Sequence, residues 1–244
     1  MRHITTTMGT VLSLESAASA ETVAAVDAVF AELDATFSLY RPDSELSRVR
    51  SGVEPLMDAS PLLLDAYARA LAWRDRTGGA FTPHRPDGVL DLDGIVKGMA
   101  IDQAGKVLGS GDWCLNVGGD VLVSGSAPDG AWSVGIVDPA GRDRLLTAIP
   151  LEGPRRAAAT SGSAERGDHI WTRGRGPAEF AQVTVVAGDI VTADVLATAI
   201  VSGGRETLDL VTDAFDVDAM VVGRDGSILA TPRMTAGITA RRSG

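Results

Sequence analysis

Residues 89–109 read VLDLDGIVKGMAIDQAGKVLG and bring acidic side chains, glycines and a lysine together within ten positions. A glycine lets a ligand approach the backbone closely, and a lysine just beyond it supplies a point charge for a phosphate. The acidic residues before Lys97 could bind ribose hydroxyls or a metal ion. The stretch is not GxxxxGK[ST], so it is not a P-loop. Taken alone, Lys97 could also face solvent at a strand-to-helix turn.

A second candidate pair lies in the segment TADVLATAI, where Asp194 and Thr198 are four positions apart. On a helix this spacing puts both side chains on one face. A carboxylate and a hydroxyl there offer two hard oxygen ligands to Mg²⁺. The structural alternatives are that Asp194 favours the dipole near a helix start and that Thr198 faces the core.

Three further segments carry weaker signals. LNVGGD (115–120) and ATSG (159–162) place small residues at strand ends, where exposed backbone N–H groups can hold phosphates. A plain turn is the more common explanation of either segment. His169 in GDHIW stands beside an apolar residue, and a lone histidine in that setting is more often structural than catalytic.

The hydrophobic periodicity predicts the elements that must position these residues. Ser60 and Pro61 are suited to start a helix, Thr192 is a candidate N-cap, and Gly203–Gly204 a candidate stop. Residues 89–98 read as a strand followed by a tight loop. Strands are expected at 8–15, 132–139, 145–151 and 182–188, a strand pair broken by Gly118–Gly119 at 113–125, a strand passing into a loop from 155, and a hairpin at 218–232. Helices are expected at 16–36, 60–77, 192–204 and 206–215, over 99–111 with a glycine stop, and as a short helix opening at Ser44. This order favours an α+β fold with a largely antiparallel sheet and packed helices.

Composition narrows the function classes. A formal net charge of −10 argues against nucleic acid or an anionic membrane as the main partner. Cys114 is the only cysteine and His residues number 3, so a disulfide framework and a Cys-based zinc site are excluded. We see neither a secretory signal nor a stretch near 18 apolar residues, which leads us to expect a cytoplasmic protein without membrane insertion.

The motifs gain meaning from their order along the chain. MGT near the start is followed by FSLYRPDSELSR, GGAF, DLDGIVKGMAID, LNVGGD, ATSG, HI and finally VTVVA with ADVLATAI. This series resembles the ApbE family, the FAD:protein FMN transferases, from about Met8 to Gly204. The resemblance implies a single α+β domain over residues 1–244 that binds FAD and Mg²⁺. Members cleave the FAD pyrophosphate, attach FMN through a phosphoester to a Ser or Thr of an acceptor flavoprotein, and release AMP. Some relatives instead hydrolyse FAD to FMN and AMP.

The resemblance also assigns roles to individual residues. It implies that Mg²⁺ is bound by the backbone oxygen of Gly94 and the side chains of Asp194 and Thr198. Asp194 or His169 could take the proton from the acceptor hydroxyl, and the choice between them stays open. The implied FAD contacts are Met8, Tyr40, Ala80, Phe81, Thr82, Asp91, Lys97 and Trp171.

The sequence departs from the family pattern on the flavin and acceptor side. Where members usually continue HI into Asp-Pro-x-Thr-Gly, this chain reads HIWTRGRGP. Val49–Arg50, Thr82 and Ser163–Ala164 also replace the usual residues. A flavin-binding protein without turnover is therefore a third hypothesis beside the transferase and the hydrolase. The intact metal-side motifs argue against it, since a mere binder has less need of a metal at the pyrophosphate.

Overall fold

The computed structural model describes residues 1–162 and 178–235, and its largest element is an antiparallel sheet. Eight strands follow the order β1-β2-β3-β4-β7-β8-β9-β10, and every neighbouring pair is antiparallel. Their bounds are Arg2–Thr7, Thr10–Ser16, Trp113–Val117, Asp120–Ser124, Ala157–Gly162, Phe180–Ala187, Asp218–Gly223 and Ile228–Ala230. A separate hairpin joins β5 (Trp132–Asp138) to β6 (Gly141–Leu151). The predicted α+β fold with a largely antiparallel sheet is confirmed.

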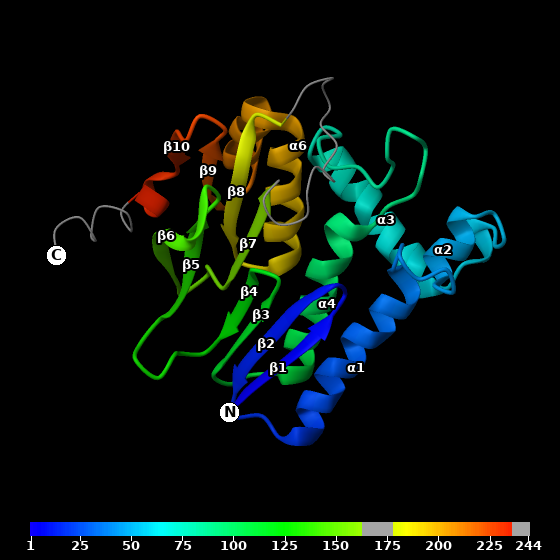
Figure 1. Ribbon diagram of the computed structural model, residues 1–244, viewed down its shortest axis with the longest axis horizontal. Coiled ribbons are helices and arrows are strands. Elements are labelled where there is room, and N and C mark those ends of the chain that lie inside the picture. Colours follow the sequence, from blue (N-terminus) through cyan, green and yellow to red (C-terminus); the bar gives the residue numbers. More distant parts are fainter. Residues whose placement is uncertain (163–177, 236–244) are drawn as a thin grey trace.

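Helices cover one face of the sheet, with α4 between α1 and α6 (Figure 1). The main hydrophobic core lies between these helices and the strands. Helix α1 buries Val23, Val26, Phe30 and Leu33, whose spacing places them on one helix face. The long helices are α1 (Ala20–Phe37), α3 (Pro61–Arg76), α4 (Asp93–Leu108) and α6 (Ile190–Ala214), with short helices α2 (Glu45–Arg50) and η1 (Leu56–Asp58) between them.

A second, smaller core lies on the opposite face, under the β5–β6 hairpin. Side chains alternate along a strand, so Val121 and Val123 of β4 point to this core while Leu122 belongs to the main one. The same alternation puts Asp120 on the helix side. Strand β4 therefore separates a helix-covered face from a hairpin-covered face.

The prediction of a strand and a tight loop at 89–98 is wrong. Strand pairing there is limited to one isolated bridge between His84 and Leu90, and helix α4 already begins at Asp93. The Asp91 carboxylate accepts a hydrogen bond from the Asp93 amide at 2.9 Å, which satisfies one N–H at the helix start. Lys97 is therefore a helical residue whose direction is set by packing against α6 and the sheet.

Smaller differences concern element ends. Strand β1 was not predicted; it pairs with β2 across a turn in which Met8 has a φ of 47°. The N-cap of α6 is Asp189, whose side chain accepts from the Thr192 amide at 2.8 Å, so Thr192 is not the cap. The predicted cap Ser60 is confirmed by its 3.3 Å bond from the Leu63 amide.

The predicted break at Gly203–Gly204 appears as a kink within α6, where Gly204 has a φ of 65°.

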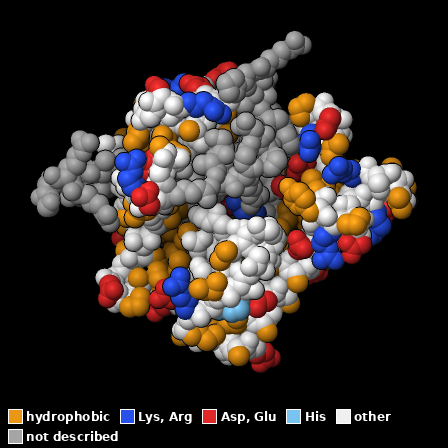
Figure 2. Space-filling view, in the orientation of Figure 1, with side chains coloured by type: hydrophobic (Ala, Val, Ile, Leu, Met, Phe, Trp, Pro, Cys, Tyr) orange, Lys and Arg blue, Asp and Glu red, His pale blue; other side chains and the backbone are white. Residues whose placement is uncertain are grey.

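None of the described helices is long and apolar enough to cross a membrane. Acidic and basic side chains are interspersed with apolar ones over the helices at the right of Figure 2.

Candidate functional site

The candidate site is built where α4 and α6 cross closely and run antiparallel. A Cβ added at Gly98 would lie 3.1 Å from the Val191 backbone, so the helices touch at this point. A Cβ added at Gly94 would lie 2.9 Å from the Phe81 ring and 3.5 Å from the Thr198 methyl group. A side chain at either position would crowd the facing helix or the Phe81 ring, so glycine allows the close approach. The contact brings residues about 100 positions apart in the chain into one site.

Three charged side chains meet at this contact. The Lys97 ammonium lies 2.5 Å from Asp120 Oδ2 and 3.8 Å from Asp194 Oδ1. The other Asp194 oxygen accepts a hydrogen bond from the Gly98 amide at 3.0 Å, and Asp120 Oδ1 accepts one from the Thr160 amide at 3.1 Å. We call Lys97, Asp120 and Asp194 the lysine cluster.

The lysine cluster is buried and carries an excess of negative charge. Its members expose 8%, 0% and 2% of their surfaces, in chain order. The alternative that Lys97 faces solvent is therefore wrong. A buried ammonium requires anionic partners, and the two aspartates supply them. One ammonium and two carboxylates leave a formal charge of −1 on these three side chains. That excess suits a cation more than an unaccompanied anion.

Oxygen atoms next to the lysine cluster fit a hard divalent cation. The half-buried Thr198 hydroxyl lies one helical turn from Asp194 on α6 and 3.2 Å from the Ser161 hydroxyl. Within residues 1–162 and 178–235, His, Cys, Asp and Glu residues do not gather in groups of three or more that could hold a metal. Mg²⁺ commonly takes only one or two protein carboxylates and completes its shell with water and substrate oxygens, so this sparse set fits it.

The loop after α3 brings two of the predicted FAD contacts to α6. The buried Thr77 hydroxyl accepts a hydrogen bond from the Phe81 amide at 3.1 Å and so fixes the loop where α3 ends. A Cβ added at Gly203 would lie 3.0 Å from the Ala80 methyl group. Ala80 therefore packs near Gly203 of α6, while the Phe81 ring lies against Gly94 of α4.

Two other predicted contacts lie on the segment that leads from this loop into α4. Thr82 is half-buried, and its hydroxyl accepts from the His84 amide at 3.2 Å. Burial raises the pKa of the Asp91 carboxyl, although its hydrogen bond from the Asp93 amide acts in the opposite direction. Asp91 lies two residues before the start of α4, and its amide donates to the carbonyl of Pro83, the neighbour of Thr82, at 2.8 Å.

The remaining sequence-predicted residues are not joined to the lysine cluster. Met8 is half-buried at the β1–β2 turn, and Tyr40 is 85% exposed on the loop after α1. In the parts of the chain that the structure describes, neither forms a hydrogen bond with the cluster. His169 and Trp171 lie outside the described residues.

Asp120 and Ser161 are site residues that the sequence reasoning did not single out. Both lie in segments that were noted for their glycines and small residues, LNVGGD and ATSG. The available signal was an aspartate at the start of the mainly apolar segment DVLVS. This residue, Asp120, is wholly buried in the structure. A buried carboxylate in such a position calls for a cationic partner.

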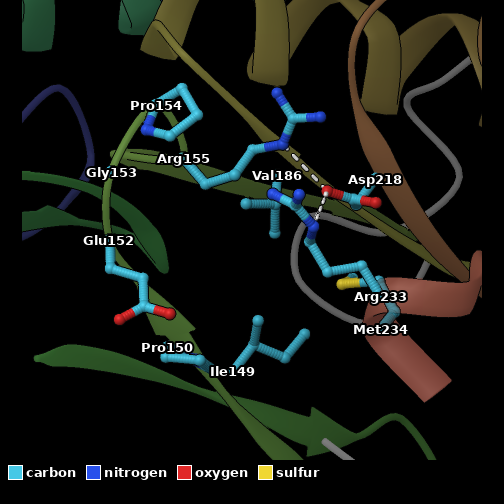
Figure 3. Close-up of a pocket in the computed structure, with 10 residues that line it drawn as sticks. All are labelled: Ile149, Pro150, Glu152, Gly153, Pro154, Arg155, Val186, Asp218, Arg233 and Met234. Atoms are coloured by element: carbon cyan, nitrogen blue, oxygen red, sulfur yellow. Dashed lines mark hydrogen bonds and ion pairs between the residues drawn. The ribbon is translucent and has the colours of Figure 1, made fainter. Parts of the chain in front are cut away.

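The described residues also line a cavity of about 580 Å³, which lies on the other face of the sheet. Figure 3 shows Arg155 and Arg233 both directed at Asp218 in its wall. Its apolar side is formed by the second core, including Ile149, Val186 and Met234. The cavity shares no residue with the lysine cluster or with the sequence-predicted site.

Comparison with known proteins places this arrangement in a family. The ApbE family model matches residues 8–86 and 82–221. The chain belongs to the ApbE family. A search of curated proteins gave no significant match.

Solved structures share the fold over nearly the whole chain. The flavin transferase ApbE from Vibrio cholerae is 23% identical with a TM-score of 0.77, and 97% of this chain and 98% of that chain are covered. The ApbE protein from Thermotoga maritima is 21% identical with a TM-score of 0.79 and the same coverage. The apo flavinyl transferase ApbE from Pseudomonas stutzeri is 20% identical with a TM-score of 0.76, covering 97% of both chains.

Proposed function

We propose that the chain is an Mg²⁺-dependent FAD:protein FMN transferase. Family membership supports this reaction class, and two of the structurally similar proteins are named flavin or flavinyl transferases. The observation that carries the proposal is the α4–α6 contact, which holds Asp194 beside Lys97 and Thr198 beside Gly94. Hard oxygen atoms and a fixed positive charge then lie together, as transfer at a pyrophosphate requires.

In the proposed reaction, the hydroxyl oxygen of an acceptor Ser or Thr attacks the FMN-side phosphorus of FAD. The bond from that phosphorus to the bridging oxygen breaks, and AMP leaves with that oxygen. The hydroxyl proton passes to Asp194 or to His169. When water takes the place of the acceptor, the products are FMN and AMP.

The chain's own residues position the reactants and balance charge. Asp194, Thr198 and the Gly94 carbonyl would hold Mg²⁺, which neutralises charge on the pyrophosphate when bound. Lys97 adds a fixed cation beside that group. The FAD contacts proposed from the family resemblance are Met8, Tyr40, Ala80, Phe81, Thr82, Asp91, Lys97 and Trp171.

The test is AMP release from FAD at saturating Mg²⁺, with and without a peptide that carries a Ser/Thr-Gly-Ala-Thr segment. Asp194→Ala should lower the rate by about 10³-fold or more, because it removes both the proposed ligand and one candidate base. Flavin fluorescence on the peptide separates transfer from hydrolysis.

Two results would count against the proposal. AMP release without labelling of any acceptor would favour an FAD pyrophosphatase. FAD binding without AMP release would favour the flavin-binding alternative that the altered HIWTRGRGP segment suggests. An Asp194→Ala variant with undiminished AMP release would remove the lysine cluster from the mechanism.

A further inference from the structure

Lys97 divides its charge unequally between two carboxylates. Its ammonium is in contact with Asp120 Oδ2 at 2.5 Å but is 3.8 Å from Asp194 Oδ1. Both carboxylates are buried, so water does not screen either interaction. Of these two anions, both within the described residues, Asp120 holds the ammonium more closely.

Asp120 is itself fixed by the sheet. It opens β4, and its Oδ1 accepts a hydrogen bond from the Thr160 amide of β7 at 3.1 Å. With one oxygen bonded to the backbone, the other is aimed at α4. No hydrogen bond in the described ranges reaches Asp120 Oδ2, which leaves the Lys97 ammonium as its ion-pair partner.

We propose that Asp120 is a positioning residue that draws the Lys97 ammonium away from Asp194, so that the Asp194 carboxylate stays available to a divalent cation. The proposal rests on the function proposed above. Without the Asp120 charge, Lys97 would have Asp194 as its anionic partner within the cluster. The ammonium would then move onto the oxygen that a metal needs, and the cluster would lose its excess negative charge.

Asp120→Asn tests this with little change in shape. The asparagine oxygen can still accept from the Thr160 amide, while the charge facing Lys97 is removed. Asp218→Asn is a matched control, because Asp218 is also a buried strand aspartate paired with a basic residue, Arg155, at 2.8 Å. It lies on the other face of the sheet, outside the proposed machinery.

Two measurements read out the effect. Binding of Mn²⁺ alone is followed by the loss of the free-ion electron paramagnetic resonance signal. The Mg²⁺ concentration that gives half-maximal AMP release from FAD is determined in parallel. We expect Asp120→Asn to weaken Mn²⁺ binding about tenfold and to raise the half-maximal Mg²⁺ concentration by a similar factor. The rate at saturating Mg²⁺ should fall much less, and Asp218→Asn should match wild type in both.

A double variant distinguishes positioning from loss of structure. If Asp120 acts through Lys97, removing the ammonium as well, in Lys97→Met/Asp120→Asn, should restore Mn²⁺ binding toward the wild-type value. This variant buries no ammonium in the cluster, so it also serves if the single variant folds poorly.

The outcomes separate the two proposals. Wild type that neither binds Mn²⁺ nor releases AMP would overturn the proposed function and this inference with it. Wild type that does both, with Asp120→Asn unchanged in metal affinity, would overturn the inference alone. A double variant that binds metal no better than Asp120→Asn would also overturn it, because Asp120 would then act independently of Lys97.

Discussion

Two buried basic residues lie on opposite faces of the same sheet, and each stands between two aspartates. Arg155 donates from Nε to Asp218 at 2.8 Å, and from Nη1 and Nη2 to the carbonyl and carboxylate of Asp216. Lys97 has one contact at 2.5 Å and a second, looser one at 3.8 Å. The guanidinium fork is thus matched by acceptors in three directions, whereas the ammonium is held off centre.

The carboxylates around Arg155 and those of the lysine cluster also differ in their exposure to solvent. The Asp216 side chain is 89% exposed, so solvent carries much of the excess charge around Arg155. Both carboxylates of the lysine cluster are buried. Buried charge without balance lowers stability, and proteins retain it mainly where a ligand or a reaction uses it. The difference is consistent with the functional role proposed for Lys97 and leads us to expect a structural role for Arg155.

Breaking the arginine side of this comparison should produce the largest change in stability. Arg155→Met leaves the Asp218 carboxylate buried without its main cation, and we expect a loss of about 3 kcal/mol in the free energy of unfolding. Urea denaturation measures it. The hydrogen bond that Arg155 donates to Asp216 raises the pKa of Arg155 and outweighs the opposing effect of burial, so the guanidinium stays protonated.

The AMP-release rate of Arg155→Met, measured well below its unfolding temperature, should match wild type. A variant that keeps its stability but loses activity would place Arg155 in the functional site and remove the distinction between the two clusters.

The thiol of Cys114 packs against the second core, on the same face of the sheet as Arg155. Burial, helped by the Glu15 charge, raises the pKa of this thiol to about 11. At pH 8 the native thiol is then almost wholly protonated, and alkylation by iodoacetamide should be slower by a factor on the order of 10² than for a free cysteine. Denatured protein is the control. Equal rates in both states would mean that this face is open to reaction.

The smallest predicted effect compares two glycines of one helix. A Cβ at Gly94 would lie 2.9 Å from the Phe81 ring, and a Cβ at Gly105 would lie 2.9 Å from the Leu122 side chain. Gly94→Ala and Gly105→Ala therefore create similar crowding and gain similar helix propensity. We expect their unfolding free energies to agree within about 1 kcal/mol.

Only Gly94→Ala should lower AMP release, by about tenfold, because the crowding falls where Phe81 and Thr198 meet α4. A circular-dichroism melt and the AMP assay on both variants supply the comparison. Equal AMP release by the two variants would show that the reaction does not depend on the close packing of Phe81 and Thr198 against Gly94.

How much of the site could be predicted follows from how local each feature is. Asp194 and Thr198 could be singled out because a spacing of four on one helix is contained in nine consecutive residues, and their role as metal ligands stays a prediction. Lys97 was found as a residue but expected on a loop, since a short apolar alternation resembles a strand until its packing partner is known. Asp120 was missed as a partner because it reaches Lys97 only after β4 joins the sheet.

Helix α4 owes its close fit to residues that weaken it in isolation. Three glycines, Gly94, Gly98 and Gly105, lie within its bounds, and each costs a helix roughly 0.5–1 kcal/mol relative to alanine. The segment is therefore a poor helix until it docks, and its contact with Asp194 closes a loop of 96 residues. A nascent chain stalled before α6 would carry the α4 motif without a formed charge cluster. The lysine cluster therefore cannot form before α6, the last long helix in the described ranges, has been synthesised.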